Sequence, residues 1–127
     1  MGKHGYNHGE IGWCQLNVSD PGKTIDFYSE LVGWEKKEAP MPDYHVFANG
    51  EESLGGITNI PEGSETPGWI PYITVSDLEA FMAKLESLGG AVVMPPQPLP
   101  DGGKLMVFKD PCGGVTGAAQ YAAEPDA

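Results

Sequence analysis

Apolar residues recur along the chain with two different periods, which predicts an α+β fold. Residues 13–18 alternate strictly between two faces, as a half-buried strand does. One face is wholly apolar, so we expect it to pack against helices. The other face mixes one large aromatic residue with polar ones and carries Trp13, Gln15 and Asn17. A face of this mixture is expected to meet solvent or a ligand.

A segment with helical spacing follows this strand, and a second one lies later in the chain. Apolar residues recur at i, i+3 and i+4 in residues 24–32 and again in residues 78–88. The run Ser19-Asp20-Pro21 predicts the start of the first helix. Ser76 and Glu79 form the S-x-x-E pattern of a capping box, which predicts the start of the second. Gly33 and Gly89 stand where each helix is expected to end.

The chain repeats itself at an offset of about 57 residues. Residues 17–20, Asn-Val-Ser-Asp, return as Thr-Val-Ser-Asp at 74–77, and 32–34 return as 88–90. Each copy reads as a strand, a helix and then further strands. We therefore predict one domain of two βαβββ modules. The first covers about residues 9–60 and the second about 69–121, with a linker at 61–68 and a tail at 122–127.

The later strands of each module are shorter and are separated by turn residues. In the first module we predict strands at 34–37, 44–48 and 54–59, with a hairpin turn at Asn49-Gly50. In the second we predict them at 91–94, 104–109 and 115–121. Residues 95–103, which contain four prolines, are predicted to form a long loop. A lid over a ligand site and a plain solvent loop are both compatible with that composition.

Composition narrows the partners that we expect. The formal net charge is −11, and an acidic surface repels phosphate backbones, which argues against nucleic acid. The same charge weakly favours a cationic ligand, but solubility is its simpler explanation. There is no run of about 18 apolar residues, so no membrane partner is expected. Cys14 and Cys112 lack metal or disulfide spacing, and with no signal peptide pattern they suggest reduced thiols in the cytoplasm.

The ordered motifs resemble those of the vicinal oxygen chelate superfamily, the glyoxalase, bleomycin-resistance and dioxygenase family. The motifs are Val18-Ser19-Asp20 with Phe27-Tyr28, Leu31-Val32-Gly33-Trp34, Leu54-Gly55-Gly56-Ile57 and Asp110-Pro111-Cys112-Gly113. The resemblance covers roughly residues 9–121. It implies that the two modules form a cupped mixed sheet with helices on the outer face. It also implies a small-molecule site in the cup and a homodimer, whose modules pair within one chain or swap between chains.

Enzymes of this superfamily bind a divalent metal through His, Glu or Gln side chains, and the resemblance shows where those ligands would fall here. The four positions are Trp13, Gly56, Ile70 and Gly117. None of these side chains can ligate a metal. We therefore predict no metal and no other cofactor, with a divalent ion held by unusual ligands as the alternative.

The candidate ligand-binding residues are those expected to face the cup, namely Trp13, Gln15, Asn17, Tyr44, Phe47, Ile70, Tyr72 and Thr74. An apolar surface with a few polar groups is typical of a ligand site, whereas Trp13 acting only as filling is equally compatible. Tyr44 and Phe47 have opposite parity, so the sequence does not decide which one faces the cup. His45 is a weak candidate for acid–base work. His4 and His8 are expected to be exposed.

Three functions follow from these observations. The first is binding of a small molecule in the cup without a catalytic metal. The second is a metal-dependent lyase, related to lactoylglutathione lyase, or an isomerase or dioxygenase with atypical ligands, so whether the chain is an enzyme stays open. The third is a non-catalytic regulatory or partner-binding module. The identity of the ligand is not encoded in any motif of the sequence.

Overall fold

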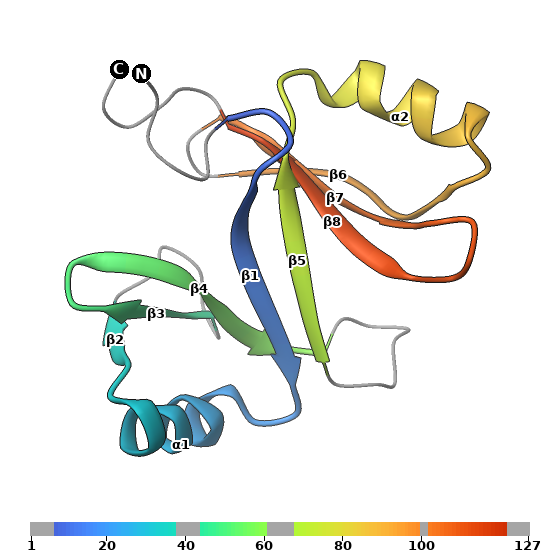
Figure 1. The fold of residues 1–127 in the computed structure, drawn as a ribbon. Helices are drawn as coiled ribbons and strands as arrows, with labels where there is room; N and C mark the ends of the chain where they lie inside the picture. The colour runs from blue at the N-terminus through green and yellow to red at the C-terminus, as the bar shows by residue number, and fades with distance from the viewer. Residues whose placement is uncertain (1–6, 38–43, 61–67, 100–101, 122–127) are drawn as a thin grey trace. The chain divides into compact units, whose positions relative to one another are not determined.

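Two helices and eight strands make up the fold of the computed structural model, which describes residues 7–37, 44–60, 68–99 and 102–121. The element order is a strand, a helix and three strands, given twice (Figure 1). This order confirms the predicted α+β class and the repeated βαβββ pattern. The chain divides into two compact units. The N-terminal unit is residues 13–70, and the C-terminal unit combines residues 1–12 with residues 71–127.

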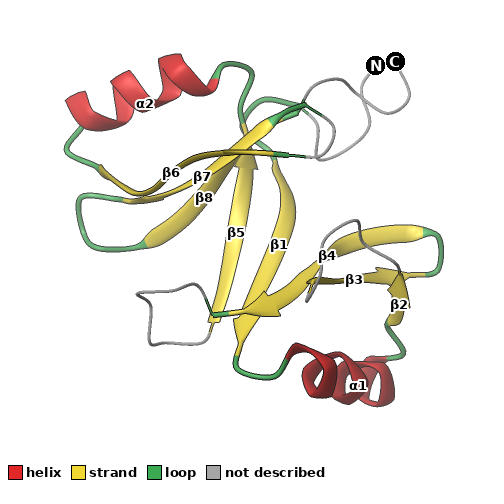
Figure 2. Ribbon diagram, turned by 180° about the vertical axis from the view of Figure 1, so that it is seen from behind, coloured by secondary structure: helices red, strands yellow, loops and turns green. Residues whose placement is uncertain are grey.

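The N-terminal unit contains a four-stranded sheet in the order β2-β3-β4-β1, with one helix, α1 (Figure 2). Strands β1 and β4 are parallel, whereas β4 with β3 and β3 with β2 are antiparallel. The elements are β1 (Ile11–Val18), α1 (Pro21–Val32), β2 (Glu35–Lys37), β3 (Tyr44–Asn49) and β4 (Glu52–Asn59). The parallel pair needs a long crossover, and α1 with β2 and β3 supplies it.

The C-terminal unit repeats this arrangement in the order β5-β8-β7-β6, with the helix α2. Its elements are β5 (Gly68–Thr74), of which residues 71–74 belong to this unit, α2 (Leu78–Ser87), β6 (Ala91–Pro98), β7 (Lys104–Lys109) and β8 (Val115–Gln120). A short segment before β1 also belongs to this unit. The Gly9 N–H donates to the Thr74 carbonyl at 2.8 Å, and the Thr74 N–H donates to the Glu10 carbonyl at 2.7 Å.

A core lies between α1 and the sheet of the N-terminal unit. Its buried members are Leu16, Ile25, Phe47 and Ile57. Phe47 stacks on Trp34 with ring centroids 4.3 Å apart, and Trp34 stacks in turn on Tyr28 at 5.1 Å. The apolar face predicted for the first strand is therefore the face that meets the helix.

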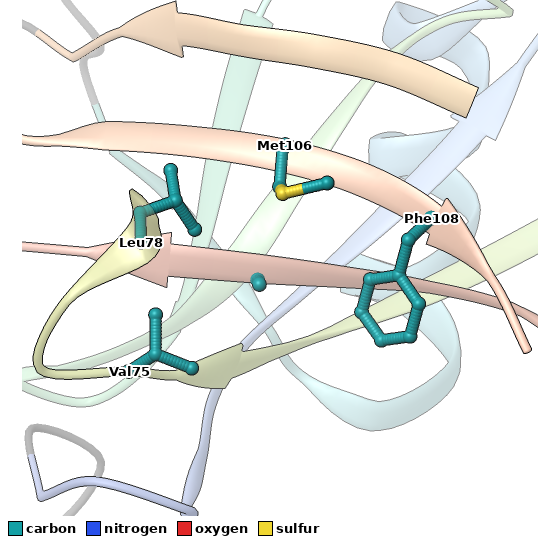
Figure 3. Close-up of a cluster of buried hydrophobic side chains, with 5 residues drawn as sticks. Val75, Leu78, Met106 and Phe108 are labelled. Carbon is teal, nitrogen blue, oxygen red and sulfur yellow. The ribbon is translucent and has the colours of Figure 1, made fainter. Parts of the chain in front are cut away.

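The C-terminal unit has a matching core under α2. Figure 3 shows Val75, Leu78, Met106 and Phe108, which with Ala118 form its buried cluster. Phe81 of α2 adds an edge-to-face contact with Phe108, at 5.2 Å between ring centroids. Each unit therefore buries one sheet face under its own helix, as the alternation in the sequence predicts.

The starts of the two helices correct one detail of the sequence analysis. Asp20 caps α1 by accepting a hydrogen bond from the Lys23 N–H at 3.1 Å, as the start signal predicts. At α2 the cap is Asp77, which accepts from the Ala80 N–H at 3.1 Å. The predicted Ser76–Glu79 capping box is thus wrong by one residue. The Ser76 N–H instead donates to His8 Nδ1 at 3.0 Å. A carboxylate beside the positive end of the helix dipole explains why the aspartate takes this position.

The position of the α2 cap can be tested by comparing alanine substitutions at Asp77 and Ser76. We expect Asp77→Ala to lower the free energy of unfolding by about 1 kcal/mol, because it removes the acceptor for an N–H of the first turn. Ser76→Ala keeps that acceptor and its own backbone N–H, so its loss should be smaller. Urea denaturation of both variants measures the difference. A larger loss for Ser76→Ala would contradict the assignment of Asp77 as the cap.

The proline-rich segment is largely strand, and the predicted loop at 95–103 is therefore wrong for residues 95–98. Strand β6 continues through Pro98, although its pairing with β7 is irregular between Met94 and Gln97. β6 is an edge strand, where a proline lacking an N–H costs no ladder hydrogen bond on the outer side. Beyond β6, the Leu99 N–H donates to the Gly103 carbonyl at 2.9 Å.

Some predicted features lie outside the described residues. These are His4, the linker at residues 61–67, residues 100–101 of the loop and the tail at residues 122–127. Across the parts of the chain that the structure describes, no helix has both the length and the apolar character needed to cross a membrane.

Candidate functional site

The face of the N-terminal sheet away from α1 carries a row of polar and aromatic residues. The strand register explains their proximity. Thr58 of β4 pairs with Asn17 of β1 on one side and with Tyr44 of β3 on the other. Gly56, two residues earlier on β4, pairs with Gln15 of β1. Because side chains two residues apart on a strand share a face, these residues lie together on one surface of the sheet.

Hydrogen bonds join four of these side chains into a continuous chain, which we call the polar row. Trp13 Nε1 donates to the Tyr44 hydroxyl at 3.0 Å. That hydroxyl donates to Gln15 Oε1 at 3.4 Å, and Gln15 Nε2 donates to Asn17 Oδ1 at 3.0 Å. Asn17 is buried, whereas Trp13, Gln15 and Tyr44 are half-buried. All four are among the ligand-binding residues predicted from the sequence, and the structure brings them together.

Gly56 allows Tyr44 to reach the other members of the polar row. A Cβ at position 56 would overlap the ring and hydroxyl of Tyr44, so the tyrosine lies directly over the glycine. The ring crosses β4 from β3 and brings its hydroxyl to Trp13 and Gln15 on β1. Any larger residue at position 56 would therefore displace the ring. The sequence did not predict this role of Gly56 or the place of Thr58 on this face. The Leu54-Gly55-Gly56 motif was the one sequence feature that could have indicated a close approach to Gly56.

Burial keeps the Tyr44 hydroxyl in its neutral form. The loss of hydration raises the pKa of Tyr44 above its ordinary value, and the hydrogen bond from Trp13 offsets only part of this increase. The phenol therefore remains protonated at neutral pH and can donate a hydrogen bond to Gln15. An ionised Tyr44 could only accept, so the polar row needs the neutral form.

The C-terminal unit shows a related arrangement at its own last strand. The ring of Tyr72, on β5, lies over Gly117 of β8, which is its direct partner in the sheet. Tyr72 and Thr74 are both buried on the face away from α2. The predicted candidate Ile70 is half-buried and belongs to the N-terminal unit. In both units a tyrosine ring therefore covers a glycine at the last-strand position.

The four positions at which the resemblance places metal ligands do not fit a divalent ion. Trp13 and Ile70 carry no suitable donor, and the rings of Tyr44 and Tyr72 occupy the space above Gly56 and Gly117. Among the residues that the structure describes, no group of three or more His, Cys, Asp or Glu side chains is placed to hold a metal. We therefore derive no chemical step through a metal at this site.

Two predicted candidates lie on the opposite face of the sheet. Phe47 is 2% exposed in the core under α1, so its predicted place among the ligand-binding residues is wrong. The structure thereby answers the question of parity in favour of Tyr44. His45 pairs with the core residue Ile57, so it lies on the sheet face of Ile57 and not on the face of Tyr44. His45 thus does not join the polar row, and the structure gives no support to an acid–base role beside Tyr44.

The remaining candidates lie apart from the polar row. Cys14 is half-buried next to Trp13 in sequence but points to the other side of β1 by parity. Cys112 is exposed in the turn between β7 and β8, where its N–H donates to Asp110 Oδ1 at 2.8 Å. His8 is exposed, as predicted, and accepts the hydrogen bond from Ser76. None of these residues extends the polar row.

The repeated fold is that of a protein of the glyoxalase type, and comparison with known proteins agrees. The family model of the Glyoxalase/Bleomycin resistance protein/Dioxygenase superfamily matches residues 10–116. The chain therefore belongs to this superfamily, which confirms the resemblance derived from its motifs.

Two curated proteins are similar to this chain at moderate to low sequence identity. The chain is 30% identical over 122 residues to "Putative glyoxylase CFP32" of Mycobacterium tuberculosis, covering 91% of this chain and 47% of that protein. It is 25% identical over 122 residues to "Anthracycline biosynthesis protein DnrV" of Streptomyces peucetius, covering 83% and 44%. The chain thus spans less than half the length of these relatives.

Solved structures extend the comparison to the fold. Methylmalonyl-CoA epimerase from Mycobacterium tuberculosis superimposes with a TM-score of 0.63 at 19% identity, covering 87% of each chain. At this identity the likeness shows a shared fold and does not transfer an activity.

Proposed function

We propose that this chain binds a small organic molecule on the sheet face of the polar row, without a catalytic metal. The observation that carries the proposal is the hydrogen-bonded row from Trp13 to Asn17, which combines two aromatic side chains with two amides on one sheet face. A few oriented polar groups among apolar and aromatic ones are what small-molecule sites provide. The two tyrosine rings over Gly56 and Gly117 support the metal-independent form of the proposal, because they fill the positions of the usual ligands.

The aromatic rings of the site favour a ligand with a flat ring. Trp13 and Tyr44 are both half-buried aromatic members of the polar row, joined by a hydrogen bond. Stacking on such rings adds roughly 0.5–1.5 kcal/mol to burial alone. The name of the Streptomyces relative, an anthracycline biosynthesis protein, refers to polycyclic aromatic compounds and supports starting with aromatic ligands.

Binding is tested by two-dimensional NMR on the uniformly ¹⁵N-labelled chain with a library of aromatic fragments. We expect hits to shift the Trp13 indole N–H and the side-chain amide signals of Gln15 and Asn17. Those signals should respond equally before and after treatment with a chelator, and elemental analysis should find no stoichiometric metal. A library that leaves these signals unmoved would refute binding on this face. Binding that is lost on chelation would refute metal independence.

A substitution of Tyr44 tests whether the polar row contributes to the affinity for a ligand. We expect Tyr44→Phe to weaken a fragment identified in this way about threefold to tenfold, because it keeps the ring but removes one hydrogen-bonding hydroxyl. Tyr28→Phe is the matched control, since Tyr28 belongs to the same unit but packs under the other sheet face against Trp34. Titration by NMR gives both affinities. Equal affinities for the two variants would contradict a role for the polar row.

A further inference from the structure

Helix α1 exposes two large apolar side chains on the side away from its core. Phe27 is 57% exposed and Leu31 is 61% exposed, whereas Ile25 of the same helix is 1% exposed. Residues four apart are neighbours on a helix surface, so Phe27 and Leu31 form one stripe. Single apolar residues scattered over a surface are normal, but a contiguous exposed group of them marks a site of interaction.

Two aromatic residues of the same unit continue this stripe. The Phe27 ring contacts Tyr28 edge to face at 5.1 Å between ring centroids, and Tyr28 contacts Trp69 in the same way at 6.3 Å. Trp69 is 44% exposed and belongs to the N-terminal unit, as α1 does. We call Phe27, Tyr28, Leu31 and Trp69 the α1 patch. Tyr and Trp are enriched among the residues that dominate binding at protein interfaces, so this composition favours a protein as the occupant.

The matching helix of the C-terminal unit has no such patch. Among residues 78–87 of α2, none is an exposed large apolar residue. The two helices hold equivalent places in the repeated modules, and α2 shows that this place does not require exposed apolar residues. The stripe on α1 is therefore a property of that helix and not of the fold.

Charged residues on one side of Phe27 make the surface of α1 complementary to itself. At about 3.6 residues per turn, the exposed residues Lys23 and Glu30 lie about 40° and 60° to one side of Phe27. Leu31 lies about 40° to the other side. With a rise of about 1.5 Å per residue, Lys23 lies about 6 Å before Phe27 along the axis and Glu30 about 4.5 Å after it. Opposite charges therefore stand at similar distances on either side of Phe27.

A second copy with its α1 antiparallel matches this arrangement. A two-fold axis through the contact of the two Phe27 rings keeps the charged sides of both helices together. Lys23 of each copy then lies within about 1.5 Å of Glu30 of the other along the helix axis, which gives two ion pairs. A parallel pair would instead place like charges side by side. Asp26 lies about 100° from Phe27, so its charge stays at the hydrated rim of the contact.

We propose that the α1 patch is a self-association surface, on which the chain binds a second copy of itself through antiparallel α1 helices. The family resemblance implied a homodimer but named no surface for it. Helix α1 covers the face of the N-terminal sheet opposite to the polar row (Figure 2). The association therefore leaves the proposed ligand face open, and it is independent of the proposed function.

Net charge and interface size limit the strength of this association. Each copy carries a formal charge of −11, so two copies repel one another, although salt at physiological ionic strength screens charges beyond about 8 Å. One helix pair with its flanking aromatic rings is a small interface for a specific contact. We therefore expect a dissociation constant between about 10 μM and 1 mM. Denaturation followed at about 1 μM protein then measures the monomer.

Sedimentation equilibrium of the unmodified chain between about 10 μM and 1 mM tests the association. We expect a reversible equilibrium of monomer and dimer, and the Trp69 indole signal in ¹⁵N NMR spectra should shift with protein concentration. Phe27→Ala should weaken the dimer at least about tenfold, because it removes the ring at the centre of the contact. A chain that stays monomeric up to about 1 mM would overturn the inference and leave the α1 patch to a different partner. A dimer that Phe27→Ala leaves unchanged would overturn it by placing the contact on another surface.

Charge-swap variants test the antiparallel arrangement. Lys23→Glu and Glu30→Lys each place like charges opposite one another, so each should weaken the dimer about threefold to tenfold. The net charge of the chain predicts opposite effects, because the first change makes it more negative and the second less negative. The double variant restores opposite charges and should recover most of the affinity. Both changes suit the helix dipole, so neither is expected to impair folding.

The matching helix α2 supplies the controls for these variants. Lys84 and Glu86 are exposed on α2, which has no exposed apolar stripe within residues 78–87. Lys84→Glu and Glu86→Lys make the same changes in charge and should alter the affinity of the dimer less than about twofold. A double α1 variant that associates no more tightly than the single variants would refute the antiparallel pairing.

Discussion

Phe47→Ala is expected to destabilise the chain by about 3–5 kcal/mol, because it removes a large ring from a closed core. Phe47 is 2% exposed and stacks on Trp34, and it also contacts Trp69 edge to face at 6.0 Å. Neighbouring rings cannot collapse into the space without losing their own contacts. Urea denaturation followed by tryptophan fluorescence measures the loss. A loss of this size approaches the whole stability of many small domains, so part of the variant is expected to be unfolded at 37 °C.

The same substitution at an exposed site is the control. Phe27 of α1 is 57% exposed, so Phe27→Ala removes an equal volume with little change in burial. We expect a change within about 0.5 kcal/mol, as for most surface substitutions. Similar losses for the two variants would show that Phe47 is not the core residue described above.

Gly55→Ala is expected to destabilise the chain by about 3 kcal/mol, the upper part of the range for overpacking. A Cβ at this position would overlap the backbone carbonyl of Cys14 on the neighbouring strand and would crowd the Phe47 ring. A side chain can change rotamer, but the Cys14 carbonyl is part of β1, so relief requires β1 and β4 to separate. Thermal and urea denaturation report the loss of stability.

Gly22→Ala is the matched control for the glycine variant. Gly22 lies in the first turn of α1, where an added Cβ would contact only Asp20 Oδ1, at 3.8 Å. Alanine has the higher helix propensity and restricts the unfolded chain, so a gain of up to about 1 kcal/mol is expected. A loss at position 22 comparable with that at position 55 would attribute both effects to backbone entropy rather than to the contact with Cys14.

Much of the fold could be predicted because periodicity and repetition are local properties of the sequence. The alternation at residues 13–18 separates a core-facing Leu16 from a polar-row residue such as Gln15, and the structure agrees. The errors arose where tertiary context decides. Nothing in the sequence says that β6 lies at a sheet edge, where Pro95 and Pro96 are tolerated. Two adjacent residues, Ser76 and Asp77, both suit a helix cap, and the chain geometry selects the second.

The candidate site was predictable only in part. Parity along β1 grouped Trp13, Gln15 and Asn17 correctly, because a single strand has a single alternation. Tyr44 lies on another strand, and its parity relative to β1 depends on the register through β4, which no local pattern reveals. The ring of Tyr44 reaches β1 only because position 56 lacks a side chain.

Two edge strands, β2 of the N-terminal unit and β6 of the C-terminal unit, have a consequence for self-association. Strand β2 has only three residues, two of them lysines, and β6 carries Pro95, Pro96 and Pro98. Charged side chains and missing N–H groups prevent another chain from adding as a further strand. Neither edge is therefore a template for amyloid-like growth, and a concentrated solution of the folded chain should resist fibril formation through these strands.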